Sequence, residues 1–219
     1  RVTYAYPEGE GNVIENACFH IRKGETVAFV GSSGAGKSTI VDILLGLLPP
    51  QQGKILVDGM DVYKNLRTWQ KEIGYIPQTI YLSDDSIRNN VAFGIEEENI
   101  DEQAVIAALK QAQLYDFVDT LPEGLDTCVG DRGIRLSGGQ RQRIGIARAL
   151  YHKPEILVLD EATSALDNDT EAAVMEAIDS LKGQKTIIII AHRLTTIKNA
   201  DTVYEVKDGK VEQTTGVNT

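Results

Sequence analysis

Short apolar runs alternate with segments of mixed polarity along this chain, and the alternation predicts an α/β fold. The apolar runs have the length of strands, and the purely aliphatic ones are typical of strands buried on both faces of a sheet. Strands are predicted over residues 26–30, 73–76, 156–159 and 186–191. Helices are predicted over residues 38–48, 86–91, 101–113, from the 136–140 segment to about 151, over 169–181, and near 195–199.

Weaker patterns predict further strands toward both ends of the chain. Residues 2–6 and 13–21 are two of them, and Asp58-Gly59 indicates a hairpin turn after a strand that follows Gly53. Two closing strands are predicted over residues 202–206 and 210–212.

These elements predict a three-layer α/β core with an N-terminal antiparallel β subdomain and an inserted α-helical subdomain. We expect a single domain in which the core and β subdomain comprise residues 1–78 and 153–219. The helical subdomain is expected over residues 79–152.

A glycine-rich segment connects the strand at 26–30 to the helix that follows it. Residues 31–38 read Gly-Ser-Ser-Gly-Ala-Gly-Lys-Ser, which fits the phosphate-binding loop of nucleoside triphosphatases. The glycines let backbone N–H groups turn onto phosphate oxygens, and the positive helix N-terminus adds to that field. Lys37 is expected to reach the β and γ phosphates, and the Ser38 hydroxyl to ligate Mg²⁺. The core is therefore predicted to be of the P-loop NTPase (RecA-like) type.

Two carboxylates, Asp160 and Glu161, directly follow the aliphatic strand at 156–159. They are expected at the carboxyl end of a buried strand, where ligands bind in open α/β sheets. Asp160 is predicted to hold Mg²⁺ through its water shell. Glu161 is predicted to act as a general base on the attacking water, which contributes about 10²–10⁴-fold in rate.

The segment Leu136–Gln140 suggests a second phosphate-binding helix end. Ser137 and Gln140 fit a capping box, but a cap does not explain Gly138 and Gly139, each of which costs roughly 0.5–1 kcal/mol relative to alanine. We interpret the glycines as making room for another molecule, because a helix N-terminus without side chains suits a γ-phosphate. One nucleotide rarely needs two such helix ends. The hypothesis is that this one serves a nucleotide held by a partner chain.

The composition of the chain argues against some classes of function. The net charge is −10, with 32 acidic and 22 basic residues, which argues against broad nucleic-acid binding. Cys18 and Cys128 fit no metal or redox spacing and are expected to be thiols in a reducing cytosol. No apolar run approaches the roughly 20 residues of a membrane span. The start without methionine, in strand-like sequence, predicts a fragment of a longer protein.

Together these motifs resemble the nucleotide-binding domain of an ATP-binding cassette (ABC) transporter, over essentially the whole chain. By this resemblance Gly31–Thr39 is the Walker A loop, Ile156–Asp160 the Walker B strand, and Leu136–Gln140 the signature sequence. The resemblance implies ATP as the nucleotide and Mg²⁺ as its cation. Two such domains would enclose two ATP molecules, each between one chain's Walker A loop and the other chain's signature.

The resemblance also assigns individual roles. Gln78 corresponds to the Q-loop glutamine that touches Mg²⁺ and the attacking water, His192 to the switch histidine that contacts the γ-phosphate, and Ser164–Asp167 to the D-loop that crosses to the partner. The catalytic residues implied are Lys37, Gln78, Glu161 and His192. The metal contacts implied are Ser38, Gln78 and Asp160. The nucleotide contacts implied are Tyr6, Gly31, Ser32, Ser33, Gly34, Ala35, Gly36, Lys37, Ser38, Thr39, Gln78, Asp160, Ser137, Gly138, Gly139 and Gln140.

The adenine is expected to stack on an aromatic ring near the N-terminus. Tyr6 occupies the position of the stacking aromatic in the family, and Tyr4, two residues earlier on the same strand face, is the alternative. Stacking of a base on an aromatic ring contributes roughly 1–3 kcal/mol in nucleic-acid complexes.

The branch of the family is indicated by residues 127–133, which resemble the stretch before the signature in exporters, with Asp131 where glutamate is usual. Residues 82–90 depart from the exporter pattern, which normally has a phenylalanine and a glycine there. The resemblance implies the ATPase domain of an exporter, at the cytoplasmic face of a membrane, whose membrane-spanning half precedes Arg1. A homodimer is the simpler expectation and a heterodimer with a degenerate partner the alternative. The pattern is also similar to that of lipid-linked oligosaccharide flippases.

Other classes remain as alternatives at this point. An importer ATPase subunit is disfavoured by residues 127–133. A DNA-repair or chromosome-organising ATPase would carry a coiled-coil insertion, and a translation factor would carry two cassettes and a basic linker. A binding module without hydrolysis is disfavoured by the presence of Glu161 and His192.

Overall fold

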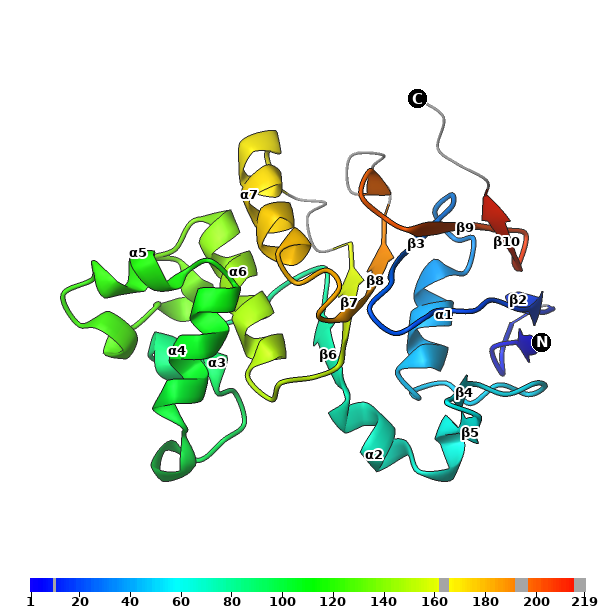
Figure 1. Ribbon diagram of the computed structural model, residues 1–219, viewed down its shortest axis with the longest axis horizontal. Coiled ribbons are helices and arrows are strands. Elements are labelled where there is room, and N and C mark those ends of the chain that lie inside the picture. Colours follow the sequence, from blue (N-terminus) through cyan, green and yellow to red (C-terminus); the bar gives the residue numbers. More distant parts are fainter. Residues whose placement is uncertain (10, 162–165, 192–196, 215–219) are drawn as a thin grey trace.

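A six-stranded sheet forms the centre of the computed structural model (Figure 1). The structure describes residues 1–9, 11–161, 166–191 and 197–214. The strand order is β10-β9-β3-β8-β7-β6. All neighbouring pairs are parallel except β10 and β9, which are antiparallel. The strands are β3 (Thr26–Val30), β6 (Ile73–Ile76), β7 (Ile156–Asp160), β8 (Thr186–Ile190), β9 (Thr202–Lys207) and β10 (Lys210–Thr214).

Both faces of this sheet are covered, as the aliphatic strands predict. On one face Phe29, Val158 and Ile190 pack with helix α1 (Lys37–Leu44) and with strands β1 (Val2–Tyr4) and β2 (Ile14–Ala17). On the other face Leu157, Leu159 and Ile187 pack with helices α6 (Gly138–Leu150) and α7 (Asn168–Asp179). The predicted three-layer α/β core is confirmed.

The antiparallel elements of the first third are also confirmed, although they are shorter than predicted. β1 pairs with β2, and β4 (Leu56–Val57) pairs with β5 (Met60–Asp61). Asp58 and Gly59 form the predicted hairpin turn, both with positive φ (50° and 80°). β2 ends at Ala17 rather than at residue 21; within it Asn16 has a left-handed φ of 49°, and the register with β1 shifts there.

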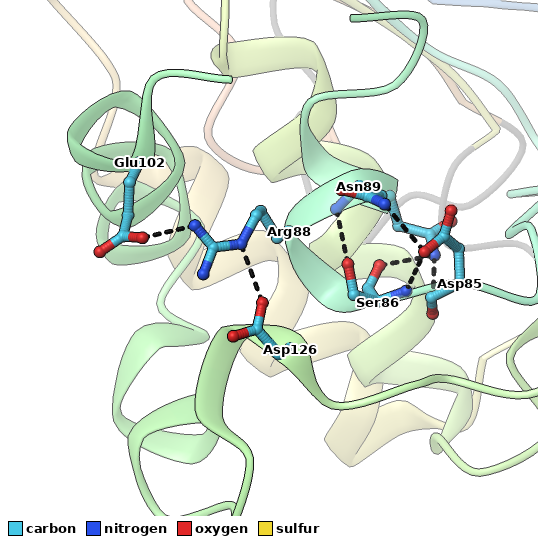
Figure 2. A network of polar contacts seen from close by, with 7 residues as sticks. Asp85, Ser86, Arg88, Asn89, Glu102 and Asp126 are labelled. Carbon is cyan, nitrogen blue, oxygen red and sulfur yellow. Dashed lines mark hydrogen bonds and ion pairs between the residues drawn. The ribbon is translucent and has the colours of Figure 1, made fainter. Parts of the chain in front are cut away.

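Helices α3 to α6 occupy much of the predicted insertion over residues 79–152. They are α3 (Ile87–Val91), α4 (Glu102–Gln111), α5 (Tyr115–Asp119) and α6. Arg88 of α3 joins Asp126, with Nε to Oδ1 at 2.9 Å, and also pairs with Glu102 of α4 (Figure 2). The predicted cap at Asp101 is confirmed, since its Oδ1 accepts a hydrogen bond from the Ala104 N–H at 3.1 Å.

Several local predictions were wrong or incomplete. α1 ends at Leu44 rather than residue 48, because Gly46 takes a φ of 78° and its N–H turns back to the Ile43 carbonyl. The short helices α2 (Leu66–Lys71) and α5 were not predicted. Of the helix predicted near 195–199, positions 195 and 196 lie outside the described residues. The thiols of Cys18 and Cys128 are free, as expected.

Gly74 allows the end of α6 to pack closely on β6. A Cβ atom built on Gly74 would lie 2.7 Å from the carbonyl oxygen of Ala149 and 2.9 Å from Cγ of Pro154. Only glycine accommodates this approach without movement of the backbone. The sequence at 73–78, which carries Gln78, is thereby held against the helix that begins with the Leu136–Gln140 segment.

Candidate functional site

The glycine-rich loop leaves β3 and enters α1, as predicted. Gly36 is the N-cap of α1 with a φ of 104°, and a Cβ atom there would lie 2.8 Å from Cδ1 of Ile14. A Cβ atom on Gly31 would lie 2.2 Å from the carbonyl oxygen of Val206. Neighbouring strands therefore require glycine at both positions, in addition to any ligand. The exposed residues of the loop are Ser32, Ser33, Gly34 and Ser38.

The side chain of Lys37 folds back toward the start of the glycine-rich loop. Its side chain donates hydrogen bonds from Nζ to the carbonyl oxygens of Gly31 (2.8 Å) and Ser32 (2.9 Å), and the residue is buried. Burial lowers the pKa of the ammonium group, while the negative charges of Glu161 and Asp160 raise it. The ammonium group therefore lies in the field of Asp160, which ends β7, and of Glu161, which follows it.

Asp160 is the last residue of β7 and Glu161 follows it, so both carboxylates lie at the carboxyl end of the sheet. Burial raises the pKa of Asp160; a hydrogen bond from Tyr75 lowers it, and repulsion by Glu161 and Asp42 raises it. Glu161 has a left-handed φ of 48°, and its N–H donates to the carbonyl oxygen of Ile190 at 3.1 Å. Such backbone strain in a non-glycine residue is common at functional sites.

The segment at the end of β6 contacts both carboxylates. Tyr75 donates from Oη to Oδ2 of Asp160 at 3.3 Å, and Gln78 donates from Nε2 to Oε2 of Glu161 at 3.0 Å. Burial and the charge of Asp160 raise the pKa of Tyr75 to about 12, so its phenol is a donor at neutral pH. Sequence reasoning missed Tyr75. Its position near the end of a strand that precedes Gln78 is the signal that could have found it.

The two tyrosines near the N-terminus differ in accessibility. Tyr6 is 40% exposed, and its hydroxyl lies 3.1 Å from the hydroxyl of Thr39. Tyr4 is 5% exposed and packs edge-to-face on Tyr6, with ring centroids 5.2 Å apart. Tyr6 therefore presents ring surface next to the glycine-rich loop, while Tyr4 belongs to the core.

The start of α6 has the predicted capping box. Ser137 Oγ accepts from the Gln140 N–H at 3.2 Å, and Gln140 Oε1 accepts from the Ser137 N–H at 2.8 Å. The interpretation of both glycines as space for another molecule stays a prediction. A Cβ atom on Gly139 would lie 2.4 Å from Cγ2 of Thr170 in α7, so packing within the chain is a second reason for glycine there. On Gly138 the nearest atom would be Cδ2 of Leu166 at 3.2 Å.

The described residues near the loop are suited to a hard divalent cation with phosphate oxygens. Ser38, Gln78 and Asp160 offer hydroxyl, amide and carboxylate oxygens, the ligand types that Mg²⁺ prefers. Among the described residues no cluster of three or more His, Cys, Asp or Glu side chains is arranged to hold a metal. Mg²⁺ is usually bound through one or two carboxylates and substrate phosphates. His192 and residues 164–165 lie outside the described residues.

Comparison with known proteins identifies the family. Residues 14–164 match the family model described as ABC transporter. The chain belongs to the ABC transporter family. It is the ATP-binding and ATP-hydrolysing domain of that family, as the glycine-rich loop, the carboxylates and the Leu136–Gln140 segment predict.

Individual relatives and a solved structure agree with this assignment. The chain is 44% identical over 211 residues to the ATP-dependent lipid A-core flippase of Methylobacillus flagellatus, covering 96% of this chain and 36% of that protein. It is 44% identical to ABC transporter B family member 13 of Arabidopsis thaliana, covering 98% of this chain and 17% of that protein. A bacterial Atm1-family ABC exporter solved with ATP bound is 40% identical and matches with a TM-score of 0.85. The match covers 97% of this chain and 37% of that chain.

The ABC-family chain thus spans about a third or less of the length of these relatives. Within the part of the chain that the structure describes, no helix combines the length and apolar character needed to cross a membrane.

Proposed function

We propose that this chain is the motor domain of an exporter and binds Mg²⁺–ATP between two copies of itself. Lys37 and the N–H groups of residues 31–39 hold the triphosphate, and the Tyr6 ring stacks on adenine. Ser38, Gln78 and Asp160 are the residues that would hold Mg²⁺, which, when bound, neutralises the charge of the phosphates.

Hydrolysis then depends on Glu161. The negative charge of its carboxylate raises the pKa of Lys37, and the carboxylate accepts a hydrogen bond from Gln78. In the proposed reaction Glu161 accepts a proton from the water that attacks the γ-phosphorus, the bond to the β–γ bridging oxygen breaks, and ADP and phosphate leave. Gln78 orients the Glu161 carboxylate and the water, and His192 contacts the γ-phosphate.

The observation that supports the two-chain arrangement is the position of two helix N-termini that are suited to bind phosphate, those of α1 and α6. α1, which follows the glycine-rich loop, packs on one face of the sheet, and α6, which begins at Gly138, packs on the other. This arrangement supports a nucleotide that is held by residues 31–39 of one chain and enclosed by residues 137–140 of the other. The symmetric solution is a homodimer with two ATP molecules.

Export across a membrane is the whole-protein activity that we propose. Residues 127–133 are exporter-like, and the relatives include proteins named as a lipid A-core flippase and an Atm1-family exporter. Because those proteins are longer, we infer that a membrane-spanning part accompanies this domain in the same polypeptide and holds it at the cytoplasmic face. Residues 79–152 form the helical subdomain in this proposal, and residues 1–78 with 153–219 form the core.

Trapping the dimer tests this proposal. Glu161→Gln keeps the size and the Gln78 contact but removes the base, so the variant is expected to elute as a dimer in size-exclusion chromatography with Mg²⁺–ATP. Lys37→Ala is expected to abolish ATPase activity and to stay monomeric. A Glu161→Gln variant that stays monomeric at saturating Mg²⁺–ATP would contradict the two-chain site.

Mixing two inactive variants tests the shared site directly. Lys37→Ala damages the phosphate loop, and Gly138→Glu places a negative charge at the start of α6. Neither variant is expected to hydrolyse ATP alone. Their mixture is expected to recover part of the activity, because one site then combines the intact loop of one chain with the intact α6 start of the other. A mixture as inactive as its components would argue for a site within one chain.

A further inference from the structure

Tyr75 lies at the edge of the sheet beside the strand that ends in the two carboxylates. It is in register with Val158 in the parallel pair β6–β7. Because side chains alternate along a strand, Tyr75, Val158 and Asp160 are on the same face, the one covered by α1. The phenol reaches Asp160 there, with Oη donating to Oδ2 at 3.3 Å.

Packing does not account for this tyrosine. It is 39% exposed and belongs to neither of the two hydrophobic clusters, whereas Ile76, the next residue of β6, is fully buried. An aliphatic residue would serve equally well at an exposed edge position. The contact that requires a tyrosine is the hydrogen bond to Asp160.

The Asp160 carboxylate needs a partner that fixes its orientation. Glu161 follows it in sequence and Asp42 faces it from α1, and both repel its charged form. Lys37, which attracts it, already donates to two backbone carbonyl oxygens. The Tyr75 hydroxyl is a neutral donor. It therefore binds one oxygen of the carboxylate without neutralising the negative charge that attracts a cation.

We propose that Tyr75 is a positioning residue for Asp160, which its phenol holds in one orientation so that the carboxylate is ready for Mg²⁺–ATP. This inference rests on the proposed role of Asp160 as a Mg²⁺ contact. Partners that orient a metal ligand commonly contribute 10–100-fold in metal affinity. A single neutral hydrogen bond at an exposed edge is expected to contribute about 10-fold, at the low end of that range.

The test measures how strongly Mg²⁺ improves nucleotide binding. A fluorescent ATP analogue is titrated into the chain with Mg²⁺ and again with EDTA, and the ratio of the two Kd values is compared between variants. Tyr75→Phe removes only the hydroxyl and is expected to lower this ratio about 10-fold, with the Kd in EDTA unchanged. A Tyr75→Phe variant with the wild-type ratio, or with both Kd values raised equally, overturns the proposal.

Tyr115→Phe is the matched control. The Tyr115 hydroxyl also donates to a carboxylate, that of Asp119 at 3.5 Å. Both residues belong to α5, whereas Tyr75 and Asp160 belong to the central sheet. This variant is expected to keep the wild-type ratio. Thermal unfolding of both variants without nucleotide shows that each is folded, and a loss of the ratio in Tyr115→Phe as well would overturn the proposal, because the effect would then not be specific to Asp160.

Asp160→Asn separates this inference from the proposed function. If Asp160→Asn removes most of the Mg²⁺ effect while Tyr75→Phe changes nothing, the role of Asp160 stands and that of Tyr75 is refuted. If Asp160→Asn keeps the full Mg²⁺ effect, the metal role of Asp160 is refuted and the inference about Tyr75 falls with it. In the double variant, Tyr75→Phe is expected to have no further effect on the ratio.

Discussion

Gln78 Nε2 lies 3.0 Å from Oε2 of Glu161, which joins the second residue after the end of β6 to the first residue after the end of β7. The contact brings an amide donor to the carboxylate proposed as the base. Glu161 itself has a strained backbone, with a φ of 48°. The proposed base is therefore in contact with a segment that lies 83 positions earlier in the chain.

Replacing Gln78 is expected to affect catalysis more than stability. Gln78→Ala removes the donor, and misorientation of a catalytic group lowers kcat on the order of 10- to 100-fold. Steady-state ATPase assays measure this. Gln184→Ala is the control, because Gln184 makes a similar amide contact, to the Ser180 carbonyl oxygen at 3.3 Å, away from the site. Equal kcat values for Gln78→Ala and wild type would refute the orienting role.

A methyl group at Gly74 is expected to destabilise the chain. Gly74→Ala forces Cβ against the Ala149 carbonyl oxygen and Pro154, and overpacking of this kind costs about 1–3 kcal/mol of unfolding free energy. Urea denaturation measures the loss. In Gly9→Ala the nearest atom would be 3.4 Å away, so little change is expected there. A wild-type midpoint for Gly74→Ala would show that α6 and β6 separate easily.

The Arg88 contacts of Figure 2 are expected to give a small, salt-sensitive contribution to stability. Arg88→Lys keeps the charge but loses the guanidinium geometry that reaches both Asp126 and Glu102, and about 0.5–1 kcal/mol of unfolding free energy should be lost. Urea denaturation at low and high salt measures it. The difference from wild type should shrink at high salt. The exposed Lys23–Glu155 pair is the control, and Lys23→Ala should change the midpoint little.

Asp42 should make stability fall as the pH rises. Burial raises the pKa of Asp42 in the folded chain above its ordinary value, so the folded state binds more protons between the two pKa values. The contribution of Asp42 to the free energy of unfolding is fully present below the ordinary pKa of about 3.9, and it is lost as the pH rises through the pKa of the folded chain. Asp42→Asn should therefore raise the urea midpoint at pH 7, with the gain disappearing toward pH 3.5. A gain that is equal at both pH values would exclude titration of Asp42 as its cause.

Sequence patterns predicted the parts of the fold in which local and global preferences agree. The strands at 26–30 and 73–76 and the cap at Asp101 are found as predicted, and the strand predicted at 156–159 extends one residue further, because an apolar run or a capping side chain fixes them locally. The short helices α2 and α5 lack a long periodic pattern, so they could not be recognised. Their position is set by packing with distant parts of the chain.

The site was predicted as a set of motifs, and the structure adds contacts between them. Spacing identified the glycine-rich loop and the carboxylates, but it contains no information about which side chain reaches which. The Tyr75 contact and the packing of Gly139 on Thr170 arise from strand register and from a helix far along the chain. Such relations become visible only when the chain is folded.

The place of β6 at the end of the strand order has a mechanical consequence. An edge strand is hydrogen-bonded to a neighbour on one side only, so it resists displacement less than a central strand. The segment at the end of β6 carries Tyr75, which donates to Asp160, and Gln78, which donates to Glu161. A displacement of this strand end would therefore change the Tyr75 contact to Asp160 and the Gln78 contact to Glu161 together. In the function proposed above, the Mg²⁺ contact and the general base would then be disturbed together rather than one by one.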